Sequence, residues 1–157
     1  MNVFYLHENP FTAAEQLCDQ HVLKMGIESA QMLATAHWMN ESEAPYKKAH
    51  VNHPSTIWTR SSSKHYDWLV NHAKGIFKEY TNRYGKTHKT ESVLRWLDEN
   101  RPKLEDKGFV PPPQCMPEEY KNHDTVKAYR DFYIYDKVLI KGLNYNRKDN
   151  APEWLFG

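Results

Sequence analysis

The sequence predicts an all-α, or nearly all-α, fold: a single compact domain of three to four helices, with a short N-terminal extended segment and a long proline-rich loop. Three observations support this prediction. Apolar residues recur at steps of three and four over most of the chain, helix start and stop signals flank those stretches, and 157 residues are the length of one ordinary domain. We therefore expect residues 1–157 to form one domain.

The first expected elements are a short extended segment and a long helix. The run from Asn2 to Leu6 is apolar and suits a brief extended segment or strand. Asn9 can cap the helix that follows, with Pro10 at its first position, where a missing N–H costs nothing. We expect this helix to run without interruption from Phe11 to Met39, before a polar turn that Pro45 closes.

Three further helices are expected along the chain. The first begins at Pro54 and ends at Gly85, and weak helix formers at 61–64 favour a bend within it. A short helix is expected over residues 90–100, and the last one over residues 124–142, where Asp124 is a good cap. Between them, Phe109 to Pro117 contains four prolines, and this segment is expected to lie as an extended arm across the surface.

Composition and charge exclude several classes of protein. The 21 basic and 20 acidic residues give a net charge of +1, so any contact with nucleic acid must come from local patches. No apolar run reaches membrane-spanning length, and no secretion signal is recognisable, so we expect a cytoplasmic protein without a membrane partner. Cys18 and Cys115 fit no metal or redox spacing, which is typical of a reducing compartment. The 9 histidines form no recognisable ligand set, and we expect no metal and no cofactor.

A polar stripe runs along the first long helix. Its members are His21, Lys24, Glu28, Gln31 and Thr35. They step by three or four residues and so lie on one line, while the rest of the helix is apolar or small. A charged line on a central helix must face a cleft, a partner or water, because unpaired buried charge is costly. The stripe is therefore either the lining of an active site or the solvent face of an amphipathic helix.

Other segments carry candidate contacts to DNA or a nucleotide. The candidates outside the stripe are His53, Arg60, Lys78, Arg83, Lys86 and Trp154. The basic residues from 78 to 89 alternate with tyrosines, a mixture that can hold phosphates while stacking bases. The alternative is a solvated helix end whose cations favour the negative end of the helix dipole.

The string DQH, Asp19 to His21, is followed by Glu28 nine residues after the aspartate, close behind a short apolar N-terminal segment. This arrangement resembles the phage pyrimidine-dimer DNA glycosylase family, of the endonuclease V type. The C-terminal PEWLFG is similar to the aromatic tail of that family. The resemblance implies a DNA-processing enzyme of a phage or bacterial cell interior, with Asp19 near the substrate.

The resemblance also implies a mechanism. In the family, the N-terminal α-amine attacks C1′ of the damaged nucleotide and forms a Schiff base, and the helix glutamate stabilises the sugar cation and promotes strand cleavage. Carried onto this chain, Glu28 is the catalytic carboxylate and His21 a supporting residue, and the amine is that of Met1 or Lys24. The chain departs from the family at Ile27 and Gln31, which stand where the family has arginines.

The sequence thus leaves three hypotheses. The leading one is a base-excision or base-processing enzyme, a DNA glycosylase with possible abasic-site lyase activity. The second keeps the fold but assigns it to a base-modifying transferase or a nucleotide-binding protein. The third is a non-enzymatic helical binding module. The sequence makes no prediction of oligomeric state.

Overall fold

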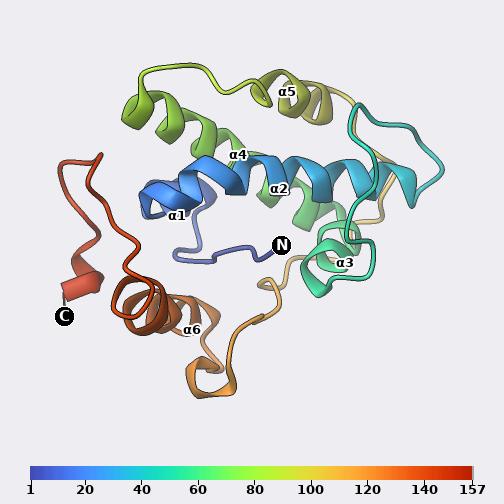
Figure 1. The fold of residues 1–157 in the computed structure, drawn as a ribbon. Helices are drawn as coiled ribbons and strands as arrows, with labels where there is room; N and C mark the ends of the chain where they lie inside the picture. Colours follow the sequence, from blue (N-terminus) through green and yellow to red (C-terminus); the bar gives the residue numbers. More distant parts are fainter. Residues whose placement is uncertain (157) are drawn as a thin grey trace.

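The computed structural model describes residues 1–156, which form an all-helical fold with no strand in that range (Figure 1). The α-helices are α1 (Pro10–Glu15), α2 (Asp19–Trp38), α3 (Pro54–Arg60), α4 (Ser63–Tyr84), α5 (Glu91–Glu99) and α6 (Thr125–Asp131). The all-α prediction is confirmed, and six helices replace the expected three to four. None of the helices described is long and apolar enough to cross a membrane.

The predicted helix from Phe11 to Met39 is wrong in one respect, because the chain forms two helices there. Asn9 caps α1 as predicted, and Pro10 is its first residue. The chain then leaves the helical path at Gln16–Cys18, where Cys18 has extended backbone angles of φ −66° and ψ 162° and serves as the N-cap of α2. The polar stripe therefore belongs to α2 alone.

The side chain of Arg83 explains why this break is stable. Its guanidinium donates hydrogen bonds to the backbone oxygens of Glu15 and Leu17, at 3.0 and 2.7 Å. These carbonyls have lost their helical partners, and a buried carbonyl without a partner costs free energy. Since Arg83 lies on α4, the break depends on a residue far away in sequence.

The predicted helix over residues 54–85 is also divided, at the weak helix formers that favoured a bend. Ser62 has an extended backbone, and its hydroxyl accepts a hydrogen bond from the N–H of Lys64 to cap α4. The same hydroxyl donates to the backbone oxygen of Gly108 at 2.7 Å, which ties the loop that follows α5 to the break. Gly85 ends α4 with a φ of 71°, as its position predicts.

The core forms where α2 and α4 cross in close contact (Figure 1). Gly26 of α2 faces the ring of Phe77, and a Cβ at this glycine would lie 2.6 Å from Phe77 Cε1. Likewise, a Cβ at Gly75 of α4 would lie 2.7 Å from the Cβ of Ala14 in α1. The two glycines therefore let the backbones of α1, α2 and α4 approach one another.

The N-terminal segment is extended, as expected, and runs between α2 and α6 (Figure 1). The structure also shows that the segment is buried from Val3 to Leu6. Phe4 carries most of the contact with the C-terminal part of the chain. Its ring packs against the rings of Tyr129, Phe132 and Tyr133. The first and last parts of the chain therefore share one hydrophobic cluster.

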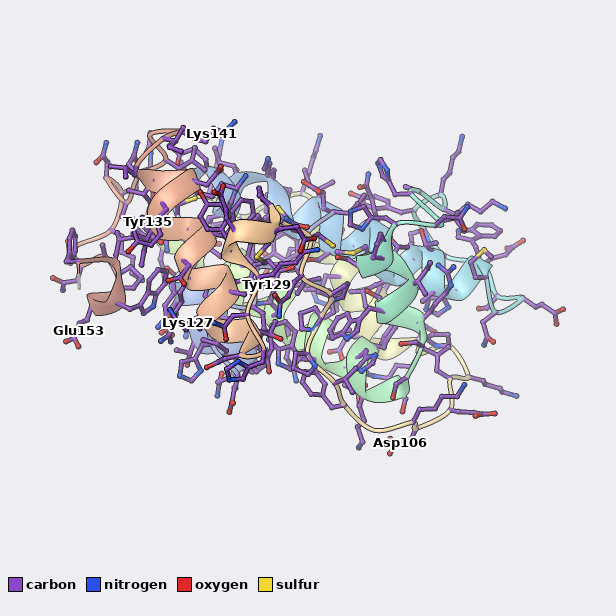
Figure 2. All side chains as sticks on the ribbon, turned by 90° about the horizontal axis from the view of Figure 1, so that it is seen from below. Asp106, Lys127, Tyr129, Tyr135, Lys141 and Glu153 are labelled. Atoms are coloured by element: carbon purple, nitrogen blue, oxygen red, sulfur yellow. The ribbon has the colours of Figure 1, made fainter. Side chains whose placement is uncertain are left out.

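The last predicted helix is only partly an α-helix. Asp124 caps α6 as expected, through a hydrogen bond from the N–H of Lys127. After Asp131 the chain does not continue as an α-helix to residue 142 but forms a π-helical segment, η2 (Phe132–Val138). Figure 2 looks onto this side of the molecule, where α6 and η2 lie between the labels of Lys127 and Lys141. A π-helical segment rotates the side chains that follow it relative to an α-helix.

The proline-rich arm from Phe109 to Pro117 contains no helix, as predicted. It is held by its backbone at Val110, whose carbonyl accepts from Trp58 Nε1 at 2.9 Å and whose N–H donates to His65 Nε2 at 3.0 Å. Polar tips of buried aromatic residues thus bond to the backbone of this arm.

Candidate functional site

An open pocket of about 200 Å³ lies where the N-terminal segment, α2 and η2 meet. The residues that line it are Met1, Asn2, Phe4, His21, Lys24, Met25, Glu28 and Lys137. All the residues expected to take part in catalysis or its support lie within the first 28 positions, and they meet here because the stripe of α2 faces the extended segment. Four residues of the sequence-based site (Met1, His21, Lys24 and Glu28) lie together here.

The α-amine of Met1 and the carboxylate of Glu28 form an ion pair in this pocket. Met1 N lies 2.9 Å from Glu28 Oε1, and the Glu28 side chain is 24% exposed, so solvent still reaches it. Asn2 holds the N-terminal segment in place by donating from Nδ2 to the backbone oxygen of Cys115 at 2.9 Å. A carboxylate in contact with an ammonium group can accept its proton and leave a neutral amine, which is a nucleophile.

Two lysines, Lys24 and Lys137, line the pocket, and the charge of a third, Lys141, acts on Lys137. Lys24 and Lys141 are exposed, and Lys137 is half-buried on η2. Burial lowers the pKa of Lys137; the carboxylate of Asp136 opposes this shift, and the charges of Lys24 and Lys141 add to it. The ring of Phe132 lies 4.7 Å from the Lys137 ammonium group, in a cation–π contact. The pocket therefore has a local positive field although the chain is nearly neutral.

His21 forms the buried wall of the pocket. The ring of Phe4 stacks on it with centroids 4.2 Å apart, and Tyr133 Oη lies 2.5 Å from its Nδ1. Burial, together with the charges of Lys24 and Lys137, lowers the pKa of His21 to about 3. The imidazole is consequently neutral at physiological pH.

Asp19 and Arg83, expected to contact substrate, pair with each other instead of lining the pocket. Arg83 Nη1 lies 3.2 Å from Asp19 Oδ1, and Asp19 Oδ2 accepts from the backbone N–H of Arg147 at 2.9 Å. Arg83 also pairs with Glu79 at 2.9 Å. Both residues are buried, and these contacts hold the junction of α1 and α2. Their contact with substrate stays a prediction.

Gln31 and Thr35 continue the stripe away from the pocket. Gln31 is half-buried one turn beyond Glu28. The hydroxyl of Thr35 donates to the backbone oxygen of Gln31 at 2.8 Å and accepts from the N–H of Ala49 at 3.0 Å. Thr35 thereby fastens the connection between α2 and α3 to the helix.

His53 and Arg60 lie at the two ends of α3. His53 caps the helix by accepting from Ser55 N. Burial lowers the pKa of His53, and the Met1 ammonium group lowers it further, whereas Glu28 raises it. His53 is therefore within electrostatic reach of the ion pair without lining the pocket. Arg60 donates from Nη1 to a backbone oxygen, that of residue 51, at 2.9 Å.

The remaining candidates lie on other surfaces. Lys78 is exposed on α4, and Lys86 lines a second pocket of about 340 Å³ with Ile27 and Tyr80. Trp154 packs against the body of the protein, where its Nε1 donates to the Gln16 side chain at 3.1 Å. These residues do not meet in the first pocket.

Sequence reasoning missed Phe4, Tyr133 and Lys137 as residues of the site. Lys137 belongs to a basic cluster near the C-terminus, which was a usable signal, and Phe4 belongs to the apolar N-terminal run. Nothing in the sequence placed Tyr133 beside His21. Within residues 1–156, no three His, Cys, Asp or Glu side chains gather in an arrangement suited to a metal ion.

Comparison with known protein families gave one match. The family model described as pyrimidine dimer DNA glycosylase matches residues 1–92. The matched range contains Met1, His21, Lys24 and Glu28, and it ends before η2 and Lys137. Comparisons with curated proteins and with solved structures gave no match.

Proposed function

The chain belongs to the pyrimidine dimer DNA glycosylase family, and from this premise we propose that it excises a base from DNA by attack of the Met1 α-amine on C1′. The C1′–N bond breaks, and its electron pair leaves with the base. The nitrogen then forms a double bond to C1′ as the C1′–O4′ bond opens, and O4′ takes up the proton that the nitrogen loses, which gives a protonated Schiff base. Glu28 accepts a proton from the amine and stabilises the positive charge that develops on the sugar.

The ion pair between Met1 and Glu28 is the observation that supports this proposal most. The amine and the carboxylate are 2.9 Å apart at the wall of an open pocket, so one group can activate the other. Lys24 is the alternative amine, but its side chain is exposed. An α-amine is also a weaker base than a lysine side chain, so a larger fraction of it is neutral near pH 7. We therefore assign the nucleophile to Met1.

The size and charge of the pocket favour DNA over a free nucleotide. Its volume of about 200 Å³ is below the roughly 300–1,000 Å³ of sites that enclose a drug-sized ligand. It suits one sugar of a polymer whose other parts lie outside. Lys24, Lys137 and Lys141 provide positive charge for the flanking phosphates, which offsets the absence of arginines at Ile27 and Gln31.

Borohydride trapping on duplex DNA with a single abasic site tests this mechanism. Borohydride reduces a Schiff base to a stable amine, so the parent protein should form a covalent adduct. Glu28→Gln keeps the shape of the side chain and removes its charge, and it should slow adduct formation by between about 100-fold and 10,000-fold. Glu99→Gln is the matched control at an exposed glutamate of α5 and should behave like the parent.

Mass mapping of the adduct identifies the amine. The DNA remnant should be found on the peptide that begins with Met1, and Lys24→Arg should form the adduct at nearly the parent rate. A remnant on Lys24 would overturn the assignment of the nucleophile. The absence of any adduct, or a Glu28→Gln variant as fast as the parent, would overturn the mechanism as a whole.

A further inference from the structure

Tyr133 forms a buried hydrogen-bonded series with Cys18 and His21, two residues at the start of α2 that are far from it in sequence, and the series ends at the pocket. Tyr133 of η2 is fully buried, and its Oη lies 2.5 Å from Nδ1 of His21. The same oxygen accepts a hydrogen bond from the backbone N–H of Cys18 at 3.3 Å and lies 3.4 Å from Cys18 Sγ. Cys18 is the N-cap of α2, so the series joins the start of this helix to the π-helical segment.

The other ring nitrogen of His21 faces the pocket. His21 Nε2 has no hydrogen-bond partner among the described residues. Within residues 1–156, Thr56 Oγ1 is the one side-chain nitrogen or oxygen that is enclosed without a partner. His21 Nε2 is not in this class, so some of its surface stays accessible. Because His21 lines the pocket, we infer that this accessible surface faces the pocket.

The position of the imidazole proton follows from the contacts of Tyr133. A phenol has one proton to donate, and here two acceptors lie near it, Nδ1 of His21 and Sγ of Cys18. An imidazole nitrogen is a stronger acceptor than sulfur, and it is also closer, at 2.5 Å against 3.4 Å. When the phenol donates to Nδ1, a neutral ring must carry its own proton on Nε2.

We propose that Tyr133 is a positioning residue that holds His21 as the neutral Nε2–H tautomer, so that this N–H donates a hydrogen bond to a sugar oxygen of DNA in the pocket. The role of the sugar rests on the proposed function, whereas the tautomer does not. Burial raises the pKa of Tyr133, and burial lowers the pKa of His21, so both groups keep these protonation states at neutral pH.

A fixed donor at this place contributes to the reaction. When Met1 attacks C1′, the C1′–O4′ bond opens and negative charge develops on the sugar oxygen. A donor that is already oriented stabilises such charge without the cost of reorganisation. The stacked ring of Phe4 and the hydroxyl of Tyr133 together fix the plane and the rotation of the imidazole. Tyr133 acts through His21 and does not itself reach the pocket lining.

The tautomer can be observed directly in the full-length protein. Long-range proton–nitrogen NMR distinguishes a protonated from an unprotonated ring nitrogen, and the signals of His21 are identified by their loss in His21→Asn. The parent should show a protonated Nε2 and an unprotonated Nδ1. In Tyr133→Phe the ring loses its partner, and the two tautomers should become mixed. A parent His21 with its proton on Nδ1 overturns the proposal, and this measurement needs no Tyr133 variant to fold.

Kinetics supply the second readout. Tyr133→Phe should lower kcat for strand cleavage at an abasic site roughly tenfold and leave KM nearly unchanged, because the interaction is strongest in the transition state. Tyr145→Phe is the matched control: it also removes a buried tyrosine hydroxyl, one that donates to the Gln16 backbone oxygen at 2.6 Å. The control should retain both kcat and the parent tautomer.

The outcomes separate this proposal from the proposed function. A Tyr133→Phe protein that folds and keeps the parent tautomer and kcat overturns the role of Tyr133. A protonated Nε2 in a parent that forms no borohydride adduct overturns the lyase mechanism, while the positioning of His21 by Tyr133 stands.

Discussion

The buried histidine His72 makes a prediction about stability against pH. It lies on α4, is 3% exposed, and donates from Nδ1 to the backbone oxygen of Pro10 at 3.0 Å. Burial lowers its pKa to about 4, although the hydrogen bond to Pro10 acts in the opposite direction. In the unfolded chain the same imidazole has the ordinary value of 6.5. The unfolded chain therefore binds more protons than the folded protein between these two values.

The sign of the effect follows from this difference. The stability associated with His72 is fully present above pH 6.5 and is lost as the pH falls toward 4. One pKa unit corresponds to about 1.4 kcal/mol, so a change from pH 7 to pH 5 should cost about 2 kcal/mol through this residue. Because His72 is buried, solvent does not screen it, and the whole pKa difference acts on stability.

Chemical unfolding in urea, followed by far-UV circular dichroism at pH 7, 6 and 5, measures this loss. His72→Asn retains an N–H donor for the Pro10 carbonyl and removes the titrating ring. Its free energy of unfolding should fall by about 2 kcal/mol less than that of the parent over this range. His123→Asn changes an exposed imidazole and should follow the parent. Parallel curves for the parent and His72→Asn would refute the reasoning.

Three further perturbations have defined outcomes. Gly26→Ala should lower the free energy of unfolding in urea by about 1–2 kcal/mol, because the clash with the Phe77 ring outweighs the better helix propensity of alanine. Adding Phe77→Leu should restore part of this loss, and a Gly26→Ala protein more stable than the parent would contradict the close contact between α2 and Phe77. Arg83→Met should lower the free energy of unfolding, measured by thermal melting, by about 3–5 kcal/mol, since it leaves the Asp19 carboxylate buried and unpaired. A loss below about 1 kcal/mol would show that the junction of α1 and α2 does not depend on the ion pair between Arg83 and Asp19. Lys137→Met should weaken binding to abasic-site DNA, measured by fluorescence anisotropy. The slope of log K against log salt concentration should become shallower by about 0.9, the value expected for one lost phosphate contact, and an unchanged slope would show that Lys137 contacts no phosphate.

Local sequence chemistry was enough to predict some of the helix starts and stops. Asn9 and Asp124 are caps, and Gly85 is a stop, because each acts on backbone groups within a few residues. The break between α1 and α2 could not be predicted in this way. It depends on the guanidinium of Arg83, which reaches carbonyls more than 60 positions earlier in the chain. A periodic apolar pattern does not record such a contact.

The candidate site likewise contains residues that the sequence spacing predicted and residues that it could not predict. The spacing of His21, Lys24 and Glu28 predicted one face of a helix, and these three residues do line one pocket. Thr35 has the same spacing, but it lies under the connection to α3, whose path the spacing does not contain. Tyr133 reaches His21 from a π-helical segment, and the helical pattern of the sequence predicted an ordinary α-helix there.

The bond between His21 and Tyr133 joins residues 112 positions apart, and it has a consequence for the order of events during synthesis. A ribosome releases the N-terminal half of the pocket long before it has made η2. Until then His21 lacks its phenol, Phe4 lacks its aromatic neighbours, and the wall that Lys137 forms is missing. Long-range contacts of this kind form late in folding. A nascent chain therefore carries the amine and the carboxylate but not a finished pocket, and competence for chemistry should appear in one step after the last quarter of the chain has emerged.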